Sequence, residues 1–301
     1  MYLIRVILAE GCGIRRIHHE PRFPWTRLFF WAKGKMIMKL DDVTISRLII
    51  DSYGKKLTSL LEVDVAMVGA GPANMTAGYY LGKAGIKAVI FESKQAPGGG
   101  MWGGGMMFNE AVLQNDAKQI ANEIGFRLRD QGDGYFTFDT VEAASMLSAR
   151  CIQAGTTIIN YVRVEDVMFR ETDGGKRVCG LVINWSPVMK LDLPVDPLSI
   201  HASYVIDGTG HTANITTTIT RKMGVRLNNR TGQVVGELPL WAEEGEPFTV
   251  ANTDEIFPGL FVVGMAANNA YGGPRMGPIF GGMLLSGKKA AEMLIHRLKR
   301  I

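Results

Sequence analysis

The stretch VDVAMVGAGPANMTAGYYLGKAGIKAVIFE, residues 63–92, decides the fold. It opens with a Val-rich apolar run over 63–68 and passes through a glycine-rich turn into a helical periodicity over 73–84. A second apolar run over 87–91 follows. This order predicts a strand, a tight turn, a helix and a parallel second strand, which together form the βαβ unit of a dinucleotide-binding fold.

The turn itself reads Gly69-x-Gly71-x-x-Asn74. Gly69 permits the tight turn, and Gly71 lets the backbone approach a pyrophosphate at the N-terminus of the helix. Glu92 lies 23 residues after Gly69, where a carboxylate can bind ribose hydroxyls. Asn74 replaces the usual third glycine, and we expect Gly78 to relieve the crowding. The alternative is a turn that only packs a helix on a strand.

The rest of the chain extends this unit. Six glycines within residues 98–105 predict a backbone surface for a ligand or a sharp crossing. Periodicity predicts helices over 110–123, 140–153 and 277–298, strands over 202–206 and 260–264, and a strand pair over 156–185 that turns at 173–175. The expected fold class is α/β: a Rossmann-like dinucleotide-binding fold of the glutathione-reductase type, with a central parallel sheet and an additional antiparallel β segment.

Charge and cysteine content set limits on function. The formal charge is +4, but residues 1–37 carry +5 and the remainder −1, so the body offers no basic stripe for nucleic acid. Cys12, Cys151 and Cys179 lack metal-site spacing and suit a reducing cytoplasm. No apolar run reaches the ~18 residues of a membrane span, so we expect a soluble body.

The first 37 residues are set apart by their composition. Aromatic residues alternate there with arginines and show little periodicity. The segment is expected to be a non-native or disordered extension upstream of a true start at Met36 or Met38, with a targeting segment or basic arm as alternatives. Residues 38–301 are then one catalytic domain, opened by an amphipathic helix.

A second informative stretch is FPGLFVVGMAANNAYGGPRMGPIFGGMLLSG, residues 257–287. Flavin enzymes of this fold end the corresponding strand in Gly-Asp, whereas this chain has Gly264-Met265, which argues against a bound flavin. Arg275 lies in the Gly/Pro-rich loop that follows, where its guanidinium could bind a carboxylate through two hydrogen bonds. The alternative is an ordinary surface arginine.

His211 and Asp196 are candidate metal ligands. His211 ends the sequence DGTGH after a predicted strand, and Asp196 lies upstream in a loop. An imidazole and a carboxylate suit a divalent iron site that is left largely open, and a histidine can also act as a general base. An N-capping aspartate and a surface histidine are the alternatives.

Together these segments resemble the thiamine thiazole synthase family. The resemblance rests on DVAMVGAGPA, FESKQAPGGGMWGGGMMFN, VEDV, VINW, DPLSI, DGTGH and RMGPIFGGMLLSG, which occur in the family's order over residues 38–301. It implies that NAD loses nicotinamide, and that the resulting ADP-ribose isomerises, condenses with glycine, takes up sulfur and closes to an adenylated thiazole carboxylate.

The resemblance also implies roles for individual residues. Iron(II) would be held by His211 and by Asp196 from a neighbouring subunit of a cytoplasmic homo-oligomer, expected to be an octamer. Arg275 would bind the glycine carboxylate. NAD, as co-substrate, would be bound by a set of residues along the chain: Gly69, Gly71, Ala73, Glu92, Ser93, Gly100, Val164, Asp196 and Met265.

One position departs from the family. Its eukaryotic members carry, two residues before Asp-Pro, a cysteine that donates its own sulfur, and archaeal relatives often carry a histidine there. This chain has Pro194, which offers neither a thiol nor a basic nitrogen. We therefore expect a multiple-turnover enzyme that uses exogenous sulfide. An FAD-dependent oxidoreductase, a ribose-1,5-bisphosphate isomerase-like sugar-phosphate isomerase and a non-catalytic dinucleotide sensor are the alternatives.

Overall fold

The computed structural model of the chain describes residues 30–32, 35–37 and 40–299. The chain divides into two compact units, residues 1–55 and residues 56–301. The predicted boundary at residue 38 and the predicted extension before it fall largely outside the described residues, so both stay predictions.

The first unit contains β1 (Phe30–Ala32), which pairs antiparallel with β2 (Lys35–Ile37), and most of helix α1 (Asp42–Ser59). Helix α1 confirms the lead-in helix that the sequence predicts. It has no buried residue, and its apolar side chains are exposed: Val43, Ile45, Leu48, Ile49 and Ile50.

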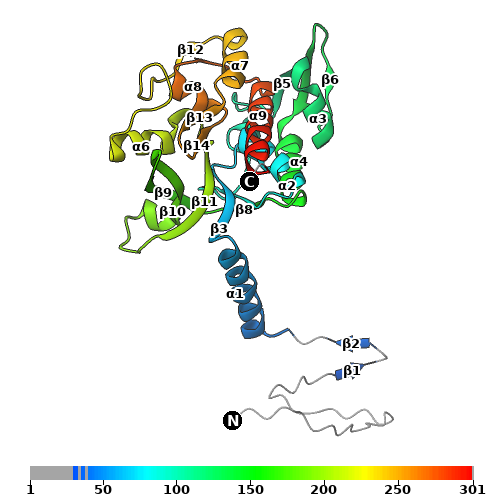
Figure 1. Cartoon of the computed structure of the whole chain (residues 1–301). Coiled ribbons are helices and arrows are strands. Elements are labelled where there is room, and N and C mark those ends of the chain that lie inside the picture. The colour runs from blue at the N-terminus through cyan, green and yellow to red at the C-terminus, as the bar shows by residue number, and fades with distance from the viewer. Residues whose placement is uncertain (1–29, 33–34, 38–39, 300–301) are drawn as a thin grey trace, which may run out of the picture. The chain divides into compact units, whose positions relative to one another are not determined.

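The second unit is built on a mixed sheet (Figure 1). Five neighbouring strands run parallel, in the order β14-β11-β3-β4-β8, and β13 joins the β14 edge antiparallel. This confirms the predicted fold class. The strands are β3 (Glu62–Val68), β4 (Ala88–Phe91), β8 (Thr157–Ile159), β11 (Leu198–Asp207), β13 (Asp254–Phe257) and β14 (Leu260–Val262).

The apolar run of β3 reflects burial on both faces of this sheet. Val65 and Met67 belong to one core cluster, whereas Ala66 and Val68 belong to the other. Successive side chains of a strand point to opposite faces, so a strand covered on both sides must be apolar throughout. That is why residues 65–68 are all apolar, whereas the polar Asp64 lies near the start of the strand, where burial is incomplete.

Different elements cover the two faces. Helices α2 (Pro72–Lys83), α4 (Thr140–Gln153) and α9 (Gly281–Leu298) pack together over the first core cluster. A Cβ on Gly78 would lie 2.8 Å from the Cys151 sulfur of α4, so Gly78 permits the close packing of α2 against α4. The second cluster packs against the remaining layer: β9 (Val162–Thr172), β10 (Gly175–Trp185), α6 (Asn214–Met223) and α8 (Met265–Tyr271).

The strand pair predicted over 156–185 forms the antiparallel segment of the fold. Strands β9 and β10 pair with each other over most of their length and turn at Asp173-Gly174, while β10 also pairs with β11. The predicted hairpin turn is therefore confirmed. Helix α5 (Ser186–Lys190) follows β10.

The helix predicted over 110–123 is wrong in its first half. Residues Glu110–Gln114 form strand β5, and α3 occupies only Lys118–Ile124, after a short turn η2 (Asn115–Ala117). Ala111 and Leu113 are buried while their neighbours are not, which is the two-residue period of a strand. β5 pairs with β7 (Tyr135–Asp139), which also pairs with β6 (Arg129–Asp130).

The C-terminal helix begins four residues later than predicted, at Gly281 rather than at residue 277. Before it, β15 (Pro274–Arg275) pairs in parallel with β12 (Leu238–Leu240), and α7 (Ala242–Ala251) follows β12. Among the described residues, no helix is both long and apolar enough to cross a membrane.

Candidate functional site

The site lies where the parallel strands end. β3 ends before Gly69, β4 before Glu92, β11 before Gly208 and β14 before Val263, and all four of these residues line one cavity of about 1350 Å³. In open α/β sheets, ligands bind outside the carboxyl ends of the strands. The topology therefore brings segments from distant parts of the chain to a single hollow.

Two backbone turns meet at the floor of this cavity. Gly69 has φ +87°, and a Cβ there would lie 2.8 Å from the Gly208 carbonyl oxygen. Asn74 donates from its amide to the carbonyl oxygens of Val68 (2.9 Å) and Gly69 (2.8 Å). A Cβ on Gly208 would lie only 2.3 Å from that same amide nitrogen. Asn74, in the place of the third glycine, thus holds the first turn by hydrogen bonds and packs closely against the second turn at Gly208.

Gly71 is different, because the protein itself does not require a glycine there. Its backbone is ordinary (φ −77°, ψ 171°), and an added Cβ would meet only the Gly208 carbonyl oxygen, at 3.9 Å. Gly71 lines the cavity just before α2 begins. The free space beside it is suited to a ligand that approaches the backbone closely.

The free space beside Gly71 predicts that alanine at this position would weaken ligand binding without affecting stability. We expect the dissociation constant for ADP-ribose to rise about 10-fold or more, since a methyl group would displace a phosphate from the helix N-terminus. The midpoint of urea unfolding should stay within error of the unmutated chain. Gly103→Ala is the control, because Gly103 also has free space but does not line the cavity. Equal weakening by both variants, measured by calorimetry, would contradict the assignment.

Glu92 is buried directly after β4, and its carboxylate accepts hydrogen bonds from backbone N–H groups. One carboxylate oxygen accepts from the Ala70 N–H at 2.7 Å, and the other accepts from the Lys94 N–H at 2.8 Å. The carboxylate therefore ties the second strand to the first glycine turn. The oxygen that accepts from Lys94 also accepts from the Ser93 hydroxyl at 3.4 Å, whereas the oxygen that accepts from Ala70 keeps a lone pair for a hydroxyl group of a ligand.

The turn after β11 is organised by Asp207, which the sequence analysis did not single out. Its side chain is fully buried. One oxygen accepts from the Thr209 N–H and hydroxyl (3.1 and 2.7 Å), and the other accepts from the N–H groups of Ile215 (3.1 Å) and Thr216 (2.9 Å) and from the Thr216 hydroxyl (2.8 Å). Asp207 thereby fixes both the turn and the start of α6, and so the place of His211 between them.

His211 and Arg275 come together at the rim of the cavity. The His211 side chain is 56% exposed and the Arg275 side chain 54% exposed. Both are contacted by Glu237: its carboxylate oxygens lie 2.8 and 2.9 Å from Nδ1 of His211, and one lies 3.9 Å from Nε of Arg275. Sequence reasoning missed Glu237, since it precedes a three-residue strand in a segment without clear periodicity.

Nearly every site residue predicted from the sequence lines the cavity. Its lining includes Gly69, Gly71, Ala73, Glu92, Ser93, Gly100, Val164, His211, Met265 and Arg275. It also includes basic side chains that the sequence analysis did not name: Lys94, Arg163, Lys190 and Arg221. A diphosphate would meet a favourable potential in such a lining.

Asp196 is the exception among the proposed residues. It is exposed on the segment between α5 and β11 and is not part of the cavity lining. The described residues hold no cluster of three or more His, Cys, Asp or Glu side chains that could bind a metal ion within one chain. Of these two proposed ligands, only His211 therefore lines the cavity of a single chain.

The two cysteines among the described residues are also outside the cavity lining. Cys151 is fully buried in α4, and burial raises the pKa of its thiol to about 12. It therefore stays protonated and unreactive near neutral pH. Cys179 is partly exposed on β10.

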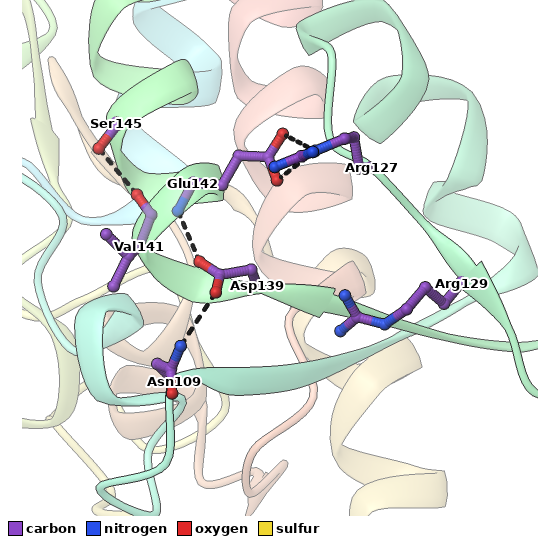
Figure 2. A pocket seen from close by; sticks show the side chains of 7 residues that line it. All are labelled: Asn109, Arg127, Arg129, Asp139, Val141, Glu142 and Ser145. Carbon is purple, nitrogen blue, oxygen red and sulfur yellow. Dashed lines mark hydrogen bonds and ion pairs between the residues drawn. The ribbon is translucent and has the colours of Figure 1, made fainter.

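A second hollow, of about 730 Å³, lies beside the small sheet (Figure 2). Its charged groups satisfy one another: Nε of Arg127 lies 2.7 and 2.8 Å from the carboxylate oxygens of Glu142, and Asp139 accepts from the Glu142 N–H at 2.8 Å and from Asn109 at 2.9 Å (Figure 2). Asp139 is the N-cap of α4, so this cluster has a structural role.

The parallel sheet, the glycine turn with its buried acid and the cavity at the strand ends define a dinucleotide-binding α/β protein. Comparison with known proteins narrows this class. Residues 46–280 match the model of the Thi4 family. The chain belongs to that family.

Comparison with individual relatives supports the same family. The thiamine thiazole synthase of Methanothermobacter thermautotrophicus is 50% identical over 262 residues, which are 87% of this chain and all of the relative. That of Pyrococcus horikoshii is 48% identical over 260 residues, 86% of this chain and 99% of the relative. The crystal structure of Thermovibrio ammonificans THI4 superposes with a TM-score of 0.86 at 50% identity, covering 87% of this chain and all of that one. The family and these names support an enzyme in thiazole synthesis.

Proposed function

We propose that this protein is a thiamine thiazole synthase that forms an adenylated thiazole carboxylate from NAD, glycine and exogenous sulfide, with iron(II). One observation carries the proposal. A single cavity unites the glycine turn and Glu92 with His211 and Arg275, although these residues are spread over 207 positions of the chain. A dinucleotide site and groups that bind a small carboxylate and move protons therefore share one space.

NAD is proposed to bind across the strand ends. Its pyrophosphate would lie against Gly71 and the N-terminus of α2, where free N–H groups and the helix dipole favour negative charge. Glu92 would accept from a ribose hydroxyl through the remaining lone pair of Oε2. Ala73, Ser93, Gly100, Val164 and Met265 would complete the lining of this half of the cavity.

Glycine is proposed to bind at the other end of the cavity. Arg275 would hold its carboxylate, because a planar guanidinium matches a carboxylate with two parallel hydrogen bonds. When it is not bound to iron(II), Nε2 of His211 would accept and return protons during imine and enamine tautomerisation, since imidazole exchanges protons near neutral pH. Both side chains are exposed enough to meet a substrate.

The donor groups suit iron(II) only if two chains cooperate. The His211 ring is bound by a carboxylate through Nδ1, as in many metal-ligating histidines. Asp196 would have to come from a second copy of the chain in a homo-oligomer, and the exposed apolar side chains of α1 are suited to contacts with another copy. Bound there, iron(II) would supply Lewis acidity and a site for sulfide.

The sulfur is proposed to come from solution. Pro194 has no thiol, Cys151 is buried and protonated, and Cys179 lies outside the cavity lining. We expect anaerobic incubation with NAD, glycine, iron(II) and sulfide to yield the adenylated thiazole carboxylate, detected by mass spectrometry. Leaving out sulfide alone should abolish the product. Product formed at an undiminished rate without sulfide would contradict the proposal.

A further inference from the structure

We propose that Glu237 is a positioning residue for this site. Its carboxylate holds the His211 ring and Arg275 at a fixed spacing and directs Nε2 of His211 toward the bound reactants. The identity of those reactants rests on the proposed function, but the placement of the two side chains does not.

The contacts determine which nitrogen of His211 is available. Both carboxylate oxygens of Glu237 lie within hydrogen-bond distance of Nδ1, at 2.8 and 2.9 Å. An ionised carboxylate only accepts hydrogen bonds, so Nδ1 must carry the hydrogen. In a neutral imidazole Nε2 then keeps its lone pair, which is the form needed to bind a metal ion or to accept a proton.

Burial makes Glu237 the fixed partner of the three. Its side chain is 13% exposed, whereas those of His211 and Arg275 are more than half exposed. A charge that is largely withdrawn from water interacts more strongly with its neighbours. Since one carboxylate contacts both the imidazole and the guanidinium, it sets the distance between a proton-transfer group and a carboxylate-binding group.

The backbone around Glu237 is anchored on both sides. The Gly236 N–H donates to the Asn269 carbonyl oxygen, and the Leu238 N–H donates to the Gly273 carbonyl oxygen, each at 2.9 Å. In the parallel pairing of β12 with β15, Leu238 lies opposite Pro274 and Leu240 opposite Arg275, so the segment that follows Glu237 is held against the segment that carries Arg275. The position of the carboxylate is therefore set by the main chain.

Removing the Glu237 side chain should act locally. The Asn269 side-chain amide donates to the main-chain carbonyl oxygen of His211, so the turn keeps a contact that does not involve Glu237. Without the carboxylate, the His211 ring can rotate and its hydrogen can occupy either nitrogen. The fold should remain while the direction of Nε2 becomes undefined.

The test compares Glu237→Ala, Glu237→Gln and the control Glu244→Gln, which removes an exposed carboxylate in α7. The first readout is the ¹⁵N spectrum of the His211 ring in protein without added ligands at alkaline pH, which shows the ring nitrogen that carries the hydrogen. His211→Ala identifies the signal. We expect hydrogen on Nδ1 in the unmutated chain and in Glu244→Gln, and a mixture of both tautomers in Glu237→Ala.

The second readout is binding and catalysis. We expect Glu237→Ala to weaken Fe(II) binding about 10- to 100-fold and to raise the KM for glycine, while the KM for NAD and the urea midpoint stay unchanged. Glu237→Gln should recover part of the loss, because its amide oxygen can still accept from Nδ1. Unchanged tautomer populations in Glu237→Ala would overturn the proposal, as would a parallel loss of NAD binding and stability. An inactive unmutated chain with hydrogen on Nδ1 would overturn the proposed function and leave this inference standing.

Discussion

Replacing Asp207 by alanine is expected to lower the free energy of unfolding by about 3–5 kcal/mol. The change removes a buried carboxylate and leaves three backbone N–H groups without their acceptor: those of Thr209, Ile215 and Thr216. Each buried donor without a partner costs about 1–3 kcal/mol, and two hydroxyl groups lose their acceptor as well. Urea unfolding followed by circular dichroism measures the loss as a lower midpoint at constant slope.

The control for this prediction is Asp51→Ala, which removes an exposed carboxylate from α1. It should leave the midpoint within about 0.5 kcal/mol of the unmutated chain. Asp207→Asn is the sharper variant, because it keeps the shape but presents an N–H₂ group to one set of donors. If Asp207→Asn and Asp207→Ala both unfolded at the midpoint of the control, the hydrogen bonds of Asp207 would not hold the second turn.

Replacing Arg275 by alanine is expected to raise the KM for glycine about 100-fold or more, with less than a threefold change in the KM for NAD. In the proposed binding mode the guanidinium donates two charge-assisted hydrogen bonds to the carboxylate of glycine, and this variant would lose both. Arg275→Lys should recover only part of the loss, since an ammonium group cannot reproduce the planar pair of donors. Initial rates at varied glycine and fixed NAD, and the reverse, separate the two constants.

Arg230→Ala controls for the loss of a positive charge, because Arg230 is exposed and outside the cavity lining. It should leave both constants unchanged. An Arg275→Ala variant in which the two KM values rise by the same factor would mean that Arg275 supports the cavity as a whole and does not bind glycine.

The parts of the fold that the sequence predicted well are those with strong local patterns. Residues 63–92 combine a buried strand, a glycine turn and a helix in adjacent positions, so the βαβ unit can be recognised without long-range information. The hairpin turn at Asp173-Gly174 is local in the same way. Its residue types favour a tight turn, and the strands on both sides alternate.

The misassigned strand β5 shows where local patterns fail. Residues 110–123 contain apolar positions that fit a helix, but the first five pair with β7, which lies more than twenty residues away. A strand is stabilised by its partner, and the partner cannot be identified from a short segment. The two-residue strand β15 is invisible to periodicity for the same reason.

The residues of the candidate site also fall into two groups: those that local sequence motifs identify and those that only distant contacts reveal. Gly71, Glu92, His211 and Arg275 belong to short motifs and could be named from the sequence. Asp207 and Glu237 act through contacts with residues elsewhere in the chain, so their roles emerge only in three dimensions. Asp196, which the resemblance singled out, does not line the cavity of a single chain, so its proposed role would require a second copy.

The central claim is that the cavity makes a thiazole repeatedly, with sulfur from solution. The most direct measurement is the number of adenylated thiazole molecules formed per chain under anaerobic conditions, together with the intact mass of the chain before and after. The account predicts more than one product per chain and an unchanged protein mass, with product sulfur that follows isotope-labelled sulfide. At most one product per chain, accompanied by loss of a cysteine sulfur from the protein, would contradict it.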